Sequence, residues 1–189
     1  MTEKLPVVVL ISGGGSNLQA LIDACQGDFP ARIVGVISNQ PDAYGLQRAT
    51  ASNIPAEVID HREFADRQQF DTRLMARIDS FQPELVLLAG FMRILTRDFV
   101  QHYRGRLLNI HPSLLPLYPG LNTHQRALDN GDTTHGASVH FVTDELDGGP
   151  VILQAAIPVY PDDDSEVLAA RVLEKEHLIY PQVLYWIAQ

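Results

Sequence analysis

Two polar residues near the middle of the chain have types and a spacing that could carry out chemistry. Asn109 and His111 stand two residues apart at the end of an apolar run, so in a strand their side chains leave the same face. Pro112 follows directly, and because proline has no backbone N–H it ends the strand there. A lone histidine is more often a packed residue than a catalyst, so these residues alone leave both interpretations open.

A glycine-rich segment near the N-terminus is the second candidate. An apolar run is followed by Gly13–Asn17 and then by apolar residues at helical spacing. Backbone amides at the start of a helix favour an anion. Dinucleotide-binding loops have a third glycine where Leu18 stands and an acidic residue where Ser38 stands, and nucleotide P-loops have a lysine that is missing here. The segment predicts a phosphate site, or else a tight turn with Ser16 or Asn17 as the helix cap.

Alternating strands and helices must position these groups. Apolar runs predict strands at residues 5–11, 33–37, 56–59, 84–89 and 106–111. Helical spacing predicts helices from Ser16 to Cys25, over 42–52, from about Arg62 to Phe81, and near 124–130. Continuous apolar strands separated by helices are typical of a parallel sheet covered on both faces.

The last third of the chain changes pattern. Residues 137–142 and 151–159 predict an antiparallel strand pair joined by a turn. A final helix is expected from near Ser165, with Pro181 kinking it and with an apolar face of Val167, Leu168, Val172, Ile179 and Leu184. The predicted fold is α/β: an open, mostly parallel Rossmann-like sheet with helices on both faces and an antiparallel C-terminal pair. Ligands are expected at the carboxyl ends of the strands.

Composition narrows the classes of function. With 189 residues, 46% of them hydrophobic, the chain is expected to form a single domain over 1–189. The net charge of −9 argues against a nucleic-acid surface. Cys25 is the only cysteine and the seven histidines are scattered, which predicts no disulfide and no metal site. No apolar segment reaches the roughly 20 residues of a membrane span, so a cytoplasmic location is expected.

Longer motifs around these residues resemble the folate-dependent formyltransferases. The resemblance is carried first by Leu-Leu-Asn109-Ile-His111-Pro-Ser-Leu-Leu-Pro116 and by Asp144-Glu-Leu-Asp147-Gly-Gly-Pro150. Ile-Ser-Gly13-Gly-Gly15-Ser16-Asn17-Leu, Ala-Gly-Phe91-Met92-Arg93-Ile94-Leu95 and Glu176-His-Leu-Ile-Tyr extend it over essentially the whole chain. They favour the branch that formylates the amine of 5-phosphoribosylglycinamide in purine (IMP) biosynthesis. Gly14 departs from the pattern, because a bulkier residue, often Asn, is expected there.

The resemblance implies a catalytic role for three residues. Asn109 would donate an N–H to the oxyanion that forms when the amine attacks the formyl group of 10-formyltetrahydrofolate. His111 as imidazolium would add a charged donor and a proton for the folate nitrogen. Asp147 would favour the charged imidazole and help to relay the proton lost by the amine. Asp147 alone, before two glycines, reads as an ordinary turn residue.

The same resemblance implies two binding sites. Gly15, Ser16 and Asn17 would hold the substrate phosphate, and Glu176 the ribose hydroxyls. The folate, a co-substrate, would contact Arg67, Met92, Arg93, Ile94, Leu95 and Asn109, although Arg67 could equally be a solvated helix residue. The expected partners are small molecules, with no nucleic acid or membrane, for a chain that is a monomer or a homodimer.

Three other functions compete with this interpretation. A formyltetrahydrofolate hydrolase would use the same three residues with water as acceptor, but it would carry an extra N-terminal domain and have little use for a phosphate loop. A methionyl-tRNA formyltransferase would add a C-terminal nucleic-acid-binding domain. A non-catalytic nucleotide-binding α/β module would leave Asn109, His111 and Asp147 unexplained.

Overall fold

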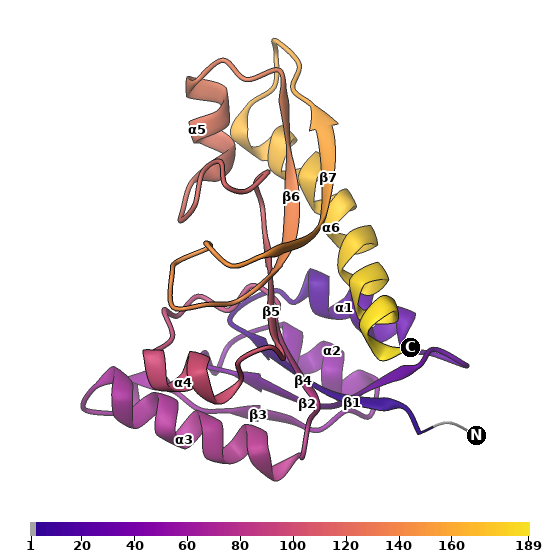
Figure 1. The fold of residues 1–189 in the computed structure, drawn as a ribbon, viewed down its shortest axis with the longest axis vertical. Coiled ribbons are helices and arrows are strands. Elements are labelled where there is room, and N and C mark those ends of the chain that lie inside the picture. The colour runs from indigo at the N-terminus through magenta and orange to yellow at the C-terminus, as the bar shows by residue number, and fades with distance from the viewer. Residues whose placement is uncertain (1–2) are drawn as a thin grey trace.

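A seven-stranded sheet runs through the protein, whose computed structural model describes residues 3–189 (Figure 1). The first two residues of the predicted domain lie outside this range. The strands are β1 (Leu5–Ile11), β2 (Ala31–Ser38), β3 (Ala56–Val58), β4 (Leu85–Leu88), β5 (Leu107–His111), β6 (Thr134–Phe141) and β7 (Val151–Pro158). The helices are α1 (Ser16–Ala24), α2 (Gly45–Ala51), α3 (Arg67–Ser80), α4 (Arg97–His102), α5 (Thr123–Asp129) and α6 (Ser165–Ala188).

The strand order is β3-β2-β1-β4-β5-β6-β7. Strands β1 to β5 pair in parallel, whereas β6 is antiparallel to both β5 and β7. This confirms the predicted mostly parallel sheet with an antiparallel C-terminal pair. Strand β1 lies in the middle of the parallel strands, and its last five residues are all apolar and buried. A strand that is covered on both faces needs apolar side chains at every position.

The two faces of the sheet pack against different helices. Alternate β1 residues Val7, Val9 and Ile11 join the core formed with α1, α2 and α6. Val8 and Leu10 point the other way and join the core formed with α3 and α4. The period-two alternation of a strand therefore sends apolar side chains into two separate cores. In Figure 1, α3 and α4 lie apart from α1 and α6, as this division requires.

Several helices differ in extent from the sequence prediction. Helix α2 begins at Gly45 rather than near residue 42. The Gly45 amide at its start donates to the Gly13 carbonyl over 3.0 Å. Helix α3 begins at Arg67 rather than near Arg62, because the Asp66 carboxylate accepts from the Gln69 amide and caps it there. Helix α4, which has six residues, is not predicted by periodicity because it completes fewer than two turns.

Helix α6 is the longest and runs along the sheet to the C-terminus of the chain (Figure 1). The Asp164 carboxylate accepts from the Val167 amide at its start. Val167 is 48% exposed, so its predicted place in the apolar face is wrong. That face instead includes Tyr180, which is fully buried. Pro181 lies inside the helix, which continues past it to Ala188. None of the helices in the described part of the chain is both long enough and apolar enough to cross a membrane.

The chain changes direction across the sheet between β1 and β4. From β1 it proceeds outward to β2 and β3, and it then returns to place β4 and β5 on the other side of β1. In open α/β sheets the loops at the carboxyl ends of two such strands diverge and leave a crevice. The loop after β1 is the glycine-rich segment, and the loop after β4 carries Met92 to Leu95. The topology therefore brings two predicted binding segments to one crevice.

Candidate active site

A serine hydroxyl joins the two loops of the crevice. The Ser12 Oγ accepts from the Met92 amide over 2.8 Å and donates to the Asn39 Oδ1. Met92 is 80 residues from Ser12 along the chain. The predicted phosphate and folate segments are therefore anchored to each other by the backbone of one loop and a side chain of the other.

The three predicted catalytic residues come together at the edge of β5. Leu108 and Ile110 face the core shared with α6, so Asn109 and His111 leave the opposite face of the strand. The His111 Nδ1 lies 3.6 Å from the Asp147 Oδ2. Asp147 comes from the turn between β6 and β7, where its φ of 51° is one that aspartate tolerates better than most residues. The structure thus places an amide, an imidazole and a carboxylate together.

The loop that follows β5 closes over two of these residues. The His111 Nε2 donates to the Tyr118 carbonyl over 2.8 Å, and the Gly120 amide donates to the Asp147 Oδ2 over 2.8 Å. Because the Nε2 carries the proton that is directed at the carbonyl, the Nδ1 of the neutral imidazole is an acceptor. That nitrogen faces the Asp147 carboxylate.

A second histidine completes the cluster, and the sequence patterns do not single it out. His140 pairs with Asn109 across β5 and β6, and its Nε2 lies 3.4 Å from the Asn109 Nδ2 and 3.9 Å from the Asp147 Oδ1. Its Nδ1 donates to the Phe141 carbonyl over 3.0 Å, which leaves the Nε2 as an acceptor for the Asn109 amide. Burial lowers the pKa of His140, so the neutral form is favoured. To find His140 from the sequence, one would need the register between β5 and β6, which pairs it with Asn109.

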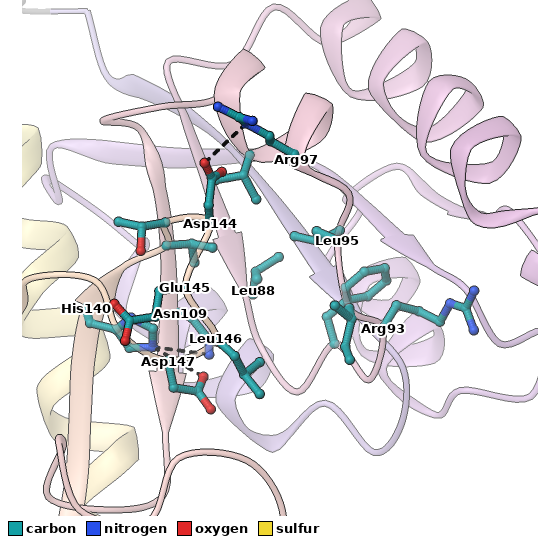
Figure 2. Close-up of a pocket in the computed structure, with 15 residues that line it drawn as sticks. Leu88, Arg93, Leu95, Arg97, Asn109, His140, Asp144, Glu145, Leu146 and Asp147 are labelled. Carbon is teal, nitrogen blue, oxygen red and sulfur yellow. Dashed lines mark hydrogen bonds and ion pairs between the residues drawn. The ribbon is translucent and has the colours of Figure 1, made fainter.

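A cavity of about 200 Å³ opens beside this cluster (Figure 2). Asn109, His140 and Asp147 line one end of it, whereas His111 does not line it. Both apolar and polar side chains line the rest: Leu88, Phe91, Ile94, Leu95, Val100, Val142 and Leu146 are apolar, and Arg93, Thr143 and Glu145 are polar. Arg97 and Asp144 close another side, with 3.5 Å between the Arg97 Nε and the Asp144 Oδ2. A cavity that combines apolar walls with polar groups able to orient a ligand is typical of a small-molecule site.

The predicted folate residues lie in this region but do not all face the cavity. Arg93, Ile94 and Leu95 line it, together with Asn109. Met92 is 66% exposed and lies outside it. The guanidinium of Arg93 extends away from Asp147 (Figure 2) and lies over the Phe70 ring, 5.6 Å from its centre.

Arg67, the remaining predicted folate residue, is exposed at the start of α3 and does not line the cavity. Arg67 and Arg93 both lower the pKa of the Asp71 carboxyl, although burial raises that pKa overall. The two arginines that were predicted for the folate lie on the α3 side of the cavity.

The predicted sugar-phosphate residues gather at the start of α1. Gly15 is the N-cap with a φ of 75°, so neither Ser16 nor Asn17 caps the helix. The Asn17 Nδ2 donates to the Glu176 Oε1 over 3.2 Å, which joins residues 159 positions apart. Glu176 is 7% exposed, and burial raises the pKa of its carboxyl. The buried Asn17 Oδ1 has no hydrogen-bond partner among residues 3–189.

Two further contacts hold these groups in place. The Tyr180 hydroxyl, one turn beyond Glu176 on α6, donates to the Leu88 carbonyl over 2.8 Å and lies 3.3 Å from the Leu108 carbonyl. It fixes α6 against the last residue of β4 and the second residue of β5. On the other side of α1, the Arg48 Nε donates to the Gly14 carbonyl over 2.7 Å. Sequence spacing does not predict this cation beside the loop, because Arg48 comes from α2.

Residues 3–189 contain no group of three or more His, Cys, Asp or Glu side chains placed to hold a metal ion.

Comparison with known proteins gives the family. The formyl transferase family model matches residues 5–184. The chain belongs to the formyl transferase family. This formyltransferase is 56% identical to the phosphoribosylglycinamide formyltransferase of Escherichia coli, over 96% of its own chain and 86% of the relative.

Other relatives agree with this assignment. The formyltransferase is 50% identical to part of the trifunctional purine biosynthetic protein adenosine-3 of Drosophila melanogaster, over 94% of its chain and 13% of that protein. The solved phosphoribosylglycinamide formyltransferase of Coxiella burnetii matches its structure with a TM-score of 0.94 and 56% identity, over 98% of this chain and 88% of the other. These matches confirm the predicted family and fold.

Proposed function

We propose that this formyltransferase moves the formyl group of 10-formyltetrahydrofolate to the amine of 5-phosphoribosylglycinamide, a step of purine synthesis. The observation that carries the proposal is the crevice itself, where the Ser12–Met92 hydrogen bond joins the segments that we expect to bind the sugar phosphate and the folate. The relatives named for this activity cover nearly the whole chain. Residues 1–189 would act as one domain on two small-molecule substrates.

Asn109 is suited to stabilise the tetrahedral oxyanion. Its amide nitrogen carries two N–H groups, of which one is directed at the neutral His140 Nε2. The other is available to the cavity that Asn109 lines. A donor that is already oriented before the reaction contributes most where negative charge develops. His140 thus positions the amide, while Asn109 would contact the formyl oxygen.

His111 and Asp147 are suited to move protons. The attacking amine loses a proton and the folate nitrogen gains one, so the site needs a group that can hold a proton between these steps. The His111 Nδ1 is that group in our proposal, because the carboxylate 3.6 Å away attracts a proton placed there. Asp147 lines the cavity and His111 does not. Asp147 would therefore pass the proton between the substrates and His111.

The start of α1 is suited to bind the phosphate. The amides of Gly15, Ser16 and Asn17 open the helix, and Arg48 places positive charge beside the preceding carbonyl. The Glu176 carboxylate, held by Asn17, would accept from the ribose hydroxyls. A binding site of this kind would explain the burial of Glu176, whose carboxylate pairs with the Asn17 amide within the described part of the chain.

The test of the proposal is a formyl-transfer assay with the purified chain. We expect 10-formyltetrahydrofolate to be consumed rapidly only when 5-phosphoribosylglycinamide is present, with one formylated product for each folate consumed. Consumption at the same rate with and without the amine would show a hydrolase instead. A chain that binds nucleotides but consumes no folate would be a binding module.

A further inference from the structure

The loop that joins β4 to α4 is fixed at two points. At one, the Met92 amide donates to the Ser12 Oγ over 2.8 Å. At the other, the Thr96 amide donates to the Asp71 Oδ2 over 2.7 Å. Between these points lie Arg93, Ile94 and Leu95, which line the cavity. The two hydrogen bonds fix the position and orientation of residues 93–95 relative to the rest of the site.

A buried aspartate is an unusual acceptor for the Thr96 amide. It lies on α3 and is fully buried, with 0% of the residue exposed. Burying a carboxylate is costly unless it is fully hydrogen-bonded, and here the Oδ1 has no partner within the described structure. An amide or a hydroxyl could accept from Thr96 at a smaller cost. Packing and the Thr96 hydrogen bond alone therefore do not explain why a carboxyl group stands at position 71.

Arg93 supplies a complementary group. Its Nε is also buried and has no hydrogen-bond partner among residues 3–189. Its guanidinium extends away from Asp147 (Figure 2) and lies over the ring of Phe70, which is on α3 and is the neighbour of Asp71 in the sequence. Burial raises the pKa of the Asp71 carboxyl, and the Thr96 hydrogen bond and the nearby Arg93 charge oppose that rise. The Asp71 carboxyl thus binds the Thr96 amide, and the Arg93 guanidinium lies on the same side of the loop, over the neighbouring Phe70.

We propose that Asp71 is a positioning residue for the folate site, which orders residues 92–96 by binding the Thr96 amide and attracting the Arg93 guanidinium. The inference rests on the proposed function, because it takes the cavity beside Asn109 as the folate site. Asp71 does not line that cavity, so it acts through the loop and not by contact with the folate.

The test compares three variants in the formyl-transfer assay. Asp71→Asn keeps the shape and an acceptor for the Thr96 amide but removes the charge, and Asp71→Leu removes both. We expect the KM for 10-formyltetrahydrofolate to rise by several-fold in Asp71→Asn and by about 10- to 100-fold in Asp71→Leu, as for the loss of a hydrogen bond to a charged group. The kcat and the KM for the amine should stay within about twofold, since loss of uniform binding raises KM alone.

Asp79→Asn is the matched control, because Asp79 lies on the same helix and the substitution removes the same charge. Its carboxylate accepts from the Tyr103 hydroxyl over 2.8 Å and contacts the His102 Nε2 at 2.7 Å, away from the folate loop. Asp79→Asn should lower the melting temperature and leave the KM for folate unchanged.

Two outcomes would overturn the inference, and a third concerns the proposed function. An unchanged KM for folate in Asp71→Asn and Asp71→Leu, with only a lower melting temperature, would make Asp71 a structural residue. An equal rise in both substrates' KM values would mean general damage to the site. If Asp71→Leu does not fold, the isosteric Asp71→Asn still decides between these results. An inactive wild-type chain would instead refute the proposed function.

Discussion

The amide of Asn109 lies between a neutral histidine and an open cavity, so its two N–H groups have different surroundings. Such a group is oriented before any substrate arrives, which is the condition under which a donor lowers an acyl-transfer barrier most. The partner histidine is held in turn by the Phe141 carbonyl. At the scale of single residues, the candidate chemistry therefore depends on one donor whose direction the neighbouring strand sets.

We expect Asn109→Ala to lower kcat by roughly 10²- to 10³-fold, the usual cost of losing one oxyanion donor. The KM values should change little, because the interaction is made in the transition state. Asn109→Asp has nearly the same shape but offers an acceptor in place of the donor, so it should be at least as inactive. Steady-state rates at saturating substrates would measure both, with melting curves to verify folding. An active Asn109→Asp would contradict the role of a donor.

At the scale of elements, the start of helix α2 is in close backbone contact with the glycine-rich loop. A Cβ added to Gly45 would lie 3.2 Å from the Gly15 Cα and 2.5 Å from the Ile11 Cδ1. The isoleucine methyl can move, but the loop backbone can move only by shifting the start of α1. Gly14, one residue earlier than the N-cap, has nothing within 4 Å of such a Cβ.

Gly45→Ala and Gly14→Ala should therefore differ. We expect Gly45→Ala to cost on the order of 1–3 kcal/mol of stability, as overpacking does, and to raise the KM for 5-phosphoribosylglycinamide more than the KM for folate. Gly14→Ala should leave both values nearly unchanged, which fits the bulkier residue expected there in the family. Denaturant unfolding and steady-state kinetics test the pair. Equal effects of the two substitutions would show that α2 does not set the loop.

At the scale of the whole molecule, buried histidines make folding sensitive to acid. His135 is 1% exposed and its Nε2 lies 3.1 Å from the His124 Nδ1. Burial, followed by the nearby His124, lowers the pKa of His135 to about 4. Burial also lowers the pKa values of His124, His140 and His177. In each case the unfolded chain binds protons more readily than the folded protein.

The sign of the pH dependence follows from linkage. Because the unfolded His135 has the higher pKa, near 6.5, the folded state loses stability as the pH falls from about 6.5 toward 4. For this residue the loss between pH 7 and pH 5 is about 2 kcal/mol. We expect His135→Gln to unfold with a smaller pH dependence than the wild type by about this amount. Urea unfolding at both pH values measures it, and parallel curves for the two proteins would refute the prediction.

The sequence alone determined those features that depend on neighbours in the chain. The apolar run from Leu5 to Ile11 coincides with β1, because a strand buried on both faces needs only continuous apolar side chains. The two-residue spacing of Asn109 and His111 determined that they share a face. The motifs around them also identified the family. These predictions needed no knowledge of how distant segments pack.

Only the tertiary structure decided which distant groups meet. Asn17 and Glu176 are 159 residues apart, Met92 and Ser12 are 80 apart, and no local pattern encodes either contact. The place of His140 beside Asn109 depends on the register of β6 against β5, and a shift of one residue would turn His140 to the other face of the sheet. Side-chain direction was also beyond the sequence, since Arg93 turns toward α3 and away from Asp147. The chain sequence thus set the elements and their faces, whereas the free energy of packing them together selected the partners within the site.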